Sequence, residues 1–263
     1  MTNATSPVGE LIREWRMRRR MSQLDLAGEA EISSRHLSFV ETGRAAPSRE
    51  MVLHLAERLD VPLRDRNVLL VAAGYAPIFA ERSLDDPALD AARQAIDALL
   101  SSHEPYPALA IDRHWTLLAH NTAAGRLMAG ADSSLLKSPI NVLRLSLHPK
   151  GVAPRILNLA EWRAHLLDRL RRQIDVTADP VLADLHKELS AYPSGSLAPP
   201  HDKGYAGIVV PLHLKTEGGV LSFLSTTTVF GTPVDITLSE IALETFFPAN
   251  AETAAALRAM AAG

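Results

Sequence analysis

Two short amphipathic segments, each opened by a serine and joined by four residues, constrain the fold of this chain more than any other feature. Ser22 is placed to cap the first segment, and Asp25, three residues later, stands where a capping box has its acid. Ser33 is placed to cap the second segment, and Gly43 supplies the left-handed residue that ends it. The pattern predicts two helices with a turn at residues 29–32.

Three further segments complete a small helical domain around this pair. Before it, Leu11, Ile12 and Trp15 share one face at helical spacing. After it, a helix starts at Pro47-Ser48 and repeats its apolar residues in the i, i+3, i+4, i+7 pattern, and a fifth runs from about Pro62 to Gly74. Residues 1–82 are therefore predicted to form an all-α, five-helix domain.

The second helix of the pair has an unusual polar face. Leu37 and Val40 anchor it inward, which leaves four side chains to project outward: Ser34, Arg35, Ser38 and Phe39. Two helices joined by a tight turn form a helix-turn-helix, whose second helix enters the major groove of DNA. Arginine can pair with a guanine edge, serine can reach a base or a phosphate, and phenylalanine can contact a thymine methyl. The face is predicted to read double-stranded DNA.

Attraction of this domain to phosphates has to come from a local patch, because its total charge is small. Residues 1–82 hold 12 Lys+Arg and 11 Asp+Glu, and the whole chain has a formal net charge of -3. The arginines that could form such a patch are Arg13, Arg16, Arg18, Arg19, Arg20, Arg35, Arg44 and Arg49.

The stretch "MSQLDLAGEAEISSRHLSFVETGRAAPSREMVLHLAERLDV" resembles the Cro/C1-type, or XRE-type, helix-turn-helix over roughly residues 11–75. The residues at the family's spacing are Gln23, Ala27, Ile32, Leu37, Val40, Glu41, Gly43, Pro47 and Ser48. The resemblance implies phosphate contacts from Gln23 and Arg44. It implies base contacts from Ser34, Arg35 and Phe39. It also implies that Arg16 pairs with Glu41 and so locks the first helix to the third.

One position departs from the pattern of that family. This chain has Glu31 in the turn, where the family usually has glycine. A non-glycine residue with a positive φ is uncommon. We therefore expect the turn to be either rearranged or slightly strained.

The chain changes character after residue 82. Asp86-Pro87 opens a helix that carries apolar residues on one face, namely Leu89, Ala92, Ile96 and Leu99, and "SSHEPYP" ends it with two prolines. This pattern predicts a connector over residues 83–104, which we expect to move when the two domains communicate.

Residues 105–263 combine helical and strand-like patterns. "ALAIDRHWTLLAHN" predicts a hairpin, and helices are expected at 122–128, after an N-cap pair of Asn158 and Glu161, and from Asp179-Pro180. Strand-like runs follow: "AGIVVPLHLKT", "GGVLSFLSTTTVFGT" and "DITLSEIALETFFP". An α+β, PAS-like domain with an antiparallel sheet covered by helices on one face is predicted.

Several stretches of this second domain are similar to the MmyB-like ligand-binding domain, which follows this helix-turn-helix in many bacterial regulators. They are "PYPALAIDRHWTLLAHN", "NVLRLSLHP", "NLAEWRAHLLDRLRRQ" and "VFGTPVDITLSEIALETFFPAN". The resemblance covers about residues 105–250. It implies a ligand-responsive transcription factor.

A pocket between the sheet and the helices would hold a small-molecule effector. Its candidate lining is Trp115, Leu143, Leu147 and Phe223, with Asn121 and His148 as polar contacts. The same aromatic residues also fit a plain core. Because the candidate lining is mostly apolar, we expect a fatty acid or a similar apolar metabolite.

Other classes of function are less well supported. The chain has no cysteine, no G-x-S-x-G, H-E-x-x-H or phosphate-loop motif, and its ten histidines lack ligand spacing. We therefore expect no catalytic residue and no metal, although an enzyme carrying a DNA-binding module is a formal alternative. A DNA-binding antitoxin, or a regulator whose second domain binds a protein partner, is the main alternative.

Composition and symmetry set the remaining expectations. No apolar run approaches the roughly 20 residues of a membrane helix, and the chain is expected in the cytoplasm. One helix-turn-helix reads only a few base pairs, so a homodimer that binds half-sites about 34 Å apart is expected.

Overall fold

The computed structural model describes residues 7–194, 210–231, 233 and 235–262, and its contacts form two compact units. The first unit is Met1–Arg82 with Pro233–Ser239, and the second is Ser83–Thr232 with Glu240–Gly263. Within the described ranges, no helix has the length and apolar character needed to cross a membrane.

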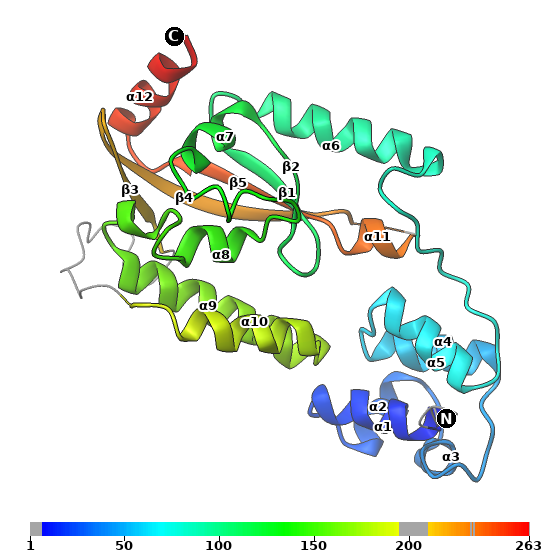
Figure 1. Cartoon of the computed structure of the whole chain (residues 1–263). Helices are drawn as coiled ribbons and strands as arrows, with labels where there is room; N and C mark the ends of the chain where they lie inside the picture. Colours follow the sequence, from blue (N-terminus) through cyan, green and yellow to red (C-terminus); the bar gives the residue numbers. More distant parts are fainter. Residues whose placement is uncertain (1–6, 195–209, 232, 234, 263) are drawn as a thin grey trace. The chain divides into compact units, whose positions relative to one another are not determined.

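The first unit contains the five predicted helices (Figure 1). They are α1 (Val8–Arg18), α2 (Gln23–Glu29), α3 (Ser34–Glu41), α4 (Arg49–Arg58) and α5 (Leu63–Ala72). Their apolar faces meet in one core, in which the side chains of Ile12, Leu26 and Leu55 are fully buried. Burial of these stripes, which recur at helical spacing, is what holds such short helices together.

The predicted helix starts and stops around the turn are confirmed. The Ser22 side chain accepts a hydrogen bond from the backbone N of Asp25, and the Asp25 side chain accepts one from the backbone N of Ser22. The Ser33 hydroxyl oxygen accepts from the backbone N of His36 at 3.1 Å. Gly43 ends the third helix with φ at +71°. These caps satisfy backbone groups that a helix leaves unpaired at its ends.

A segment from far along the chain completes the first unit. Asp235 accepts a hydrogen bond from Arg82 at 2.7 Å, and the backbone N of Ile236 donates to the carbonyl of Ala80 at 2.8 Å. The run "DITLSEIALETFFP" was predicted as one strand, and this prediction is wrong for its first half. The Asp235 carboxylate accepts from the backbone N of Thr237 at 2.9 Å, which favours a helical turn. The run divides into α11 (Ile236–Ser239) and β5 (Ala242–Pro248).

The second unit is built on a five-stranded sheet of order β2-β1-β5-β4-β3, in which the strand pairs are antiparallel. The other strands are β1 (Ala108–Ile111), β2 (Leu117–His120), β3 (Leu212–Thr216) and β4 (Gly219–Val229). The predicted hairpin is β1 and β2, and the last strand in sequence, β5, inserts between β1 and β4. Residues 206–209 of the first predicted strand-like run lie outside the described residues.

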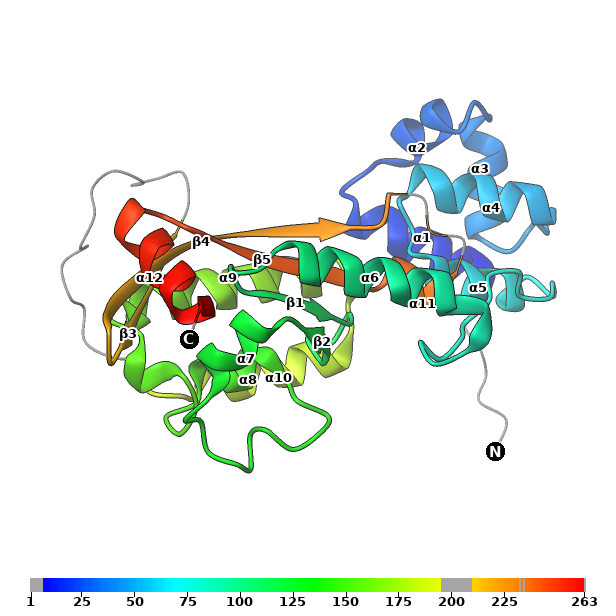
Figure 2. The ribbon, with the colours of Figure 1, turned by 90° about the horizontal axis from the view of Figure 1, so that it is seen from above.

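Helices cover this sheet, as Figures 1 and 2 show. They are α6 (Asp90–Ser102), α7 (Thr122–Met128), α8 (Val142–Leu147), α9 (Leu159–Thr177), α10 (Pro180–Ser190) and α12 (Ala251–Ala262), with 3-10 turns at Pro87–Leu89 and Ala153–Arg155. In Figure 1, α8, α9 and α10 lie on one side of β4 and β5, and α6 lies on the other. The α+β prediction is confirmed, with helices on both sides of the sheet instead of one.

Three local features of the second unit differ from the sequence prediction or go beyond it. The contacts place residues 83–104 in the second unit, in which α6 packs on β1. Leu100 is 4% exposed, whereas Leu99, which was expected on the apolar face, is 49% exposed. The apolar segment "NVLRLSLHP", to which no helix or strand was assigned from the sequence, contains helix α8, and the Asn141 side chain caps this helix. Asn158 does not cap α9 with its side chain. Its amide instead accepts from the backbone N of His213 and donates to the carbonyl of Pro211.

Candidate functional site

The outer face of α3 is laid out as the sequence predicted. Leu37 and Val40 are buried in the core of the first unit. Ser34 and Arg35 are exposed, and Ser38 and Phe39 are half-buried. This leaves the polar side of the helix open to a partner along its length.

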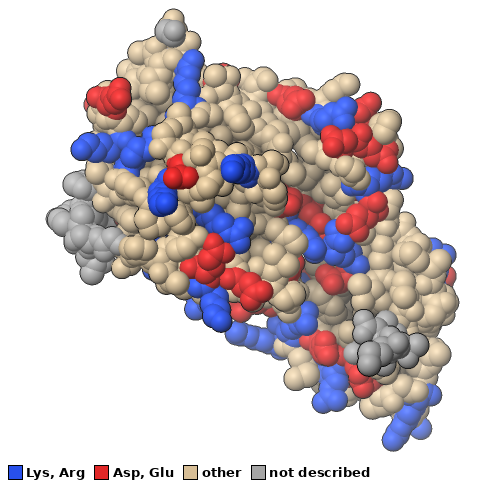
Figure 3. All heavy atoms as spheres, in the orientation of Figure 1, with Lys and Arg blue, Asp and Glu red and all other residues tan. Residues whose placement is uncertain are grey.

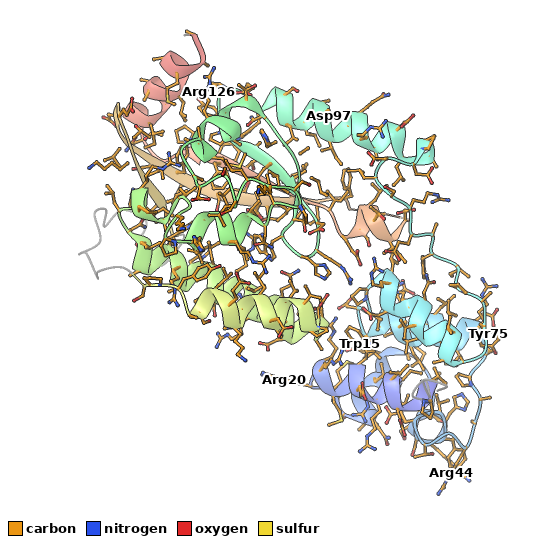
Figure 4. The ribbon with its side chains drawn as sticks, viewed as in Figure 1. Trp15, Arg20, Arg44, Tyr75, Asp97 and Arg126 are labelled. Carbon is orange, nitrogen blue, oxygen red and sulfur yellow. The ribbon has the colours of Figure 1, made fainter. Side chains whose placement is uncertain are left out.

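Two arginines flank the phenylalanine on this face. The Arg35 guanidinium carbon lies 5.4 Å from the ring centroid of Phe39, and that of Arg44 lies 5.9 Å from it. Figure 4 shows Arg44 projecting outward beyond the end of α3. At exposed sites such cation–π contacts contribute only about 0.5–1 kcal/mol each, so they orient the guanidinium groups without holding them away from a partner.

The predicted Arg16–Glu41 ion pair is present and bidentate. Arg16 Nε donates to Glu41 Oε1 at 2.6 Å, and Nη2 donates to Oε2 at 2.9 Å. The hydrogen bond to Glu41 raises the pKa of Arg16 above its ordinary value. Gln23 Nε2 also donates to Glu41 Oε2 at 2.8 Å, so the same carboxylate ties α1 and α2 to α3. That Gln23 contacts a phosphate stays a prediction, and Glu41 has a structural role.

The turn between α2 and α3 keeps a left-handed residue without glycine. Glu31 has φ at +52°, and the backbone N of Ile32 donates to the carbonyl of Ala27 at 3.0 Å. A left-handed conformation costs a residue with a Cβ roughly 1–2 kcal/mol. Of the two expected outcomes, the slightly strained turn is the one observed.

The arginines at the end of α1 and directly after it already form contacts within the first unit. Besides Arg16, Arg19 donates from Nε to the carbonyl of Leu59 at 2.7 Å, and both Arg18 and Arg19 stack on Trp15. On the face shown in Figure 3, basic and acidic side chains are interspersed over both units. Arg35 and Arg44 are therefore the charges best placed beside the polar face of α3.

The second unit contains a pocket between the sheet and helices α7, α8 and α9. Its empty volume is about 860 Å³, with the open solvent at its mouth included. Of the twenty described residues that line it, all but four are apolar, and the polar ones are Ser146, Arg169, Ser225 and Glu244. Ser146 is engaged, because its hydroxyl oxygen accepts from Trp162 Nε1 at 3.1 Å and so joins α8 to α9.

Trp115 forms one wall of this pocket in a strained conformation. Its φ is +65°, which is an outlier for a bulky side chain. Its Nε1 donates to Gln173 at 2.9 Å, and the Arg169 guanidinium lies 4.5 Å from its ring centroid. Strain of this kind persists only where the surroundings hold it in place.

Only part of the predicted lining reaches the pocket. Trp115 and Leu143 line it. Four predicted residues lie elsewhere in the second unit. Leu147 and Phe223 are almost fully buried in the core, and His148 packs against Tyr192 and accepts from the backbone N of Lys150.

Asn121 is the fourth predicted residue outside the pocket, and its amide is used by the backbone. Its carbonyl oxygen accepts from the backbone N atoms of Ala108 and Ala124, and its amino group donates to the carbonyls of Leu100 and Tyr106. A side chain so fully engaged holds α6, β1 and α7 together and has little capacity left for a ligand.

Sequence reasoning missed the charged pair at the pocket. Arg169 of α9 forms an ion pair with Glu244 of β5, and both side chains line the cavity. The one available signal was an acidic residue inside the apolar run "IALETFFP". Its partner lies 75 positions earlier in the chain, on a charged helix face that looks solvated.

Two family models match the chain. One, described as "MmyB-like transcription regulator ligand binding domain", covers residues 92–260, and the other, "Helix-turn-helix domain", covers residues 7–69. A relative from Methanoculleus marisnigri, named "Putative HTH-type transcriptional regulatory protein", is 33% identical over 120 residues. The match spans 44% of this chain and 38% of that relative, well under half of the relative's length.

Proposed function

The chain belongs to the MmyB-like transcription regulators, and on that premise we propose that it binds a specific DNA site as a homodimer in response to an apolar effector. The observation that carries the DNA half is the exposed Arg35 and Arg44 on either side of Phe39. With Leu37 and Val40 buried, these side chains face the groove that α3 enters.

The two arginines are proposed to contact different parts of the DNA, Arg35 the bases and Arg44 the phosphates. Arg35 lies in the first turn of α3, and the N-terminal residues of a reading helix contact base edges. Arg44 follows the end of α3, where the chain passes the phosphate backbone of a bound duplex. One such helix reads few base pairs, so two copies related by a two-fold axis would read both half-sites.

Arg35→Ala is expected to weaken binding to the cognate DNA site by about 1–3 kcal/mol and to leave unrelated DNA almost unaffected. Arg44→Ala is expected to weaken all sequences alike and to reduce the slope of log K against log salt by about one. Fluorescence anisotropy measures both, with a site selected by the protein from a random library and a salt titration.

Arg93→Ala is the matched control, because it removes a partly exposed arginine that is paired with Asp90 on α6. It should change neither the affinity nor the salt slope. If Arg35→Ala weakened cognate and unrelated DNA by the same factor, the assignment of Arg35 to base reading would be wrong.

The effector half of the proposal is supported by the largely apolar pocket of the second unit. Apolar surface that leaves water on binding contributes roughly 25 cal/mol per Å², so such a lining favours a hydrocarbon chain over a polar metabolite. Fatty-acyl chains offer such an apolar surface. To regulate, the effector must bind the DNA-competent and incompetent states with different affinities.

Ala124→Leu tests the pocket directly, because Ala124 lines it from α7 and is only 3% exposed. Leucine is also a good helix former and removes room for about two methylenes of a ligand, which lowers affinity about tenfold. Native mass spectrometry should find an apolar molecule retained by the wild type and largely lost from the variant.

Ala129→Leu provides the control at the exposed end of the same helix, and it should retain the wild-type amount of ligand. Equal retention by the Ala124→Leu variant would show that the molecule binds elsewhere. A wild type that retains and takes up no apolar molecule would refute the effector half and leave the DNA half standing.

A further inference from the structure

The pocket has one charged feature, the Arg169–Glu244 ion pair, in a lining that is otherwise apolar or hydroxylic. Glu244 is 5% exposed, and the Arg169 side chain is 26% exposed. Charges are rarely buried beside an apolar cavity, because each loses its hydration there. A partly buried ion pair that lines a ligand cavity is a candidate for contact with the ligand.

The sheet gathers further polar groups around this pair. Thr227 of β4 is the register partner of Glu244, and Ser225, two residues earlier, shares its face of the strand. The Thr227 hydroxyl donates to Glu244 Oε1 at 2.9 Å. Leu109 of β1 is paired with Glu244 on the other side. These polar groups therefore lie together at one end of the pocket, and the other lining residues are apolar except Ser146, whose hydroxyl oxygen accepts from Trp162.

The pair retains hydrogen-bonding capacity. Arg169 donates to Glu244 and to Thr227 from the same nitrogen, Nη2. Glu244 accepts both of its hydrogen bonds at Oε1. Within the described part of the chain, Nε and Nη1 of Arg169 and Oε2 of Glu244 have no hydrogen bond. Two residues of the pocket lining thus keep unused hydrogen-bond donors and an unused acceptor.

At this end of the pocket the positive charge of Arg169 and the negative charge of Glu244 balance each other. This balance favours neutral ligands over charged ones. Burial, and then the positive charges of Arg169 and Arg172, lower the pKa of the nearby His165, which disfavours a further positive charge beside the pair. A carboxylate ligand would compete with Glu244 for Arg169 and leave two buried carboxylates to share one cation. An ammonium ligand would compete with Arg169 for Glu244 and leave two cations to share one carboxylate. A neutral group satisfies the free donors and the free acceptor without disturbing the pair.

We propose that the effector is an amphipathic molecule whose neutral head both accepts and donates hydrogen bonds, such as a primary amide or an alcohol on a hydrocarbon chain. The head accepts from Arg169 and donates to Glu244 Oε2, and the chain lies along the apolar walls. This inference rests on the proposed effector function, because it specifies the head of the molecule that the pocket takes.

The test compares probes that share one chain: dodecanamide, dodecanol, dodecanoate and dodecyltrimethylammonium, each below its micellar concentration. Binding to the full-length protein is followed by tryptophan fluorescence, since Trp115 and Trp162 line the pocket, and by competition in native mass spectrometry. We expect dodecanamide and dodecanol to bind at least about tenfold more tightly than either charged probe, the effect of one lost charged hydrogen bond.

Glu244→Gln then changes the charge at nearly constant shape. With Arg169 no longer neutralised, the variant should prefer dodecanoate to dodecanamide by about tenfold. The double variant Arg169→Met/Glu244→Leu keeps the pocket neutral and apolar, and it should bind the two neutral probes more weakly without gaining affinity for dodecanoate. Glu188→Gln, in the Arg144–Glu188 pair outside the pocket lining, is the control and should leave the ranking unchanged.

Each outcome bears on a different claim. Tighter binding of dodecanoate by the wild type, or a ranking that Glu244→Gln does not alter, would overturn the head-group inference while the apolar effector stands. Failure of all four probes to bind would overturn the effector function itself, and the head-group inference with it. The predicted ranking and its reversal would support both.

Discussion

Glu41→Ala is expected to lower the free energy of unfolding of the helix-turn-helix unit by about 3–5 kcal/mol, among the largest effects of any single substitution in the chain. The Glu41 side chain is 1% exposed and accepts from Arg16 and Gln23. Its removal leaves the Arg16 guanidinium buried without its counter-charge and frees α1 and α2 from α3. Urea denaturation followed by circular dichroism measures the loss, and hydrogen exchange by peptide should place it in α1–α3.

Glu14→Ala, on α1, provides the matched control, because it also removes a glutamate that pairs with an arginine of that helix. Glu14 pairs with Arg18 at 3.9 Å, but its side chain is 56% exposed. Exposed pairs contribute about 0–1 kcal/mol, so this variant should unfold almost as the wild type does. The double variant Arg16→Met/Glu41→Leu should recover much of the loss, because a buried ion pair can be replaced by apolar residues. Similar losses for Glu41→Ala and Glu14→Ala would contradict the role assigned to Glu41.

Gly9→Ala is expected to destabilise the same unit by about 1–3 kcal/mol through overpacking. A Cβ at Gly9 would lie 2.2 Å from the carbonyl oxygen of Val40 and 2.8 Å from that of Glu41. Both atoms belong to the backbone at the end of α3, so α1 would have to move away and strain the Arg16–Glu41 pair. The melting temperature of the first unit should fall, and hydrogen exchange should show that this unit opens more readily.

Gly28→Ala makes the same chemical change where there is room. It lies within α2, and a Cβ there meets no atom within 4 Å. Alanine is favoured over glycine inside a helix by about 0.5–1 kcal/mol, so this variant should be slightly more stable than the wild type. If both variants shifted the melting temperature in the same direction, close packing of α1 on α3 would not be the cause.

The first unit was largely predictable because its signals are local. The caps at Ser22 and Ser33 and the stop at Gly43 act on backbone groups within four residues of themselves. The burial of Leu37 and Val40 follows from helical spacing alone. Even Glu31 was identified as a departure that leaves the turn either rearranged or strained, because the turn requires a left-handed residue whichever side chain occupies it.

The second unit was predictable as a class of fold but not in its pocket. Of the predicted lining, Trp115 and Leu143 reach the cavity. The side-chain amide of Asn121 is instead occupied by hydrogen bonds to backbone groups of three neighbouring elements. An asparagine before a helix has the same appearance in sequence whether it binds a ligand or caps that helix. The number of backbone partners within its reach, which the packing sets, decides between the two.

By itself the sequence determined the five helices of the first unit, the helix-turn-helix with its outward Arg35 and the resemblance to ligand-responsive regulators. Only the tertiary structure decided that β5 lies between β1 and β4, and that Glu244 thereby meets Arg169 at the end of an apolar pocket. Helix caps and spacing are fixed by neighbours along the chain. The pairing of a strand and the partner of a buried charge depend on contacts between residues far apart in sequence, and no local pattern encodes them.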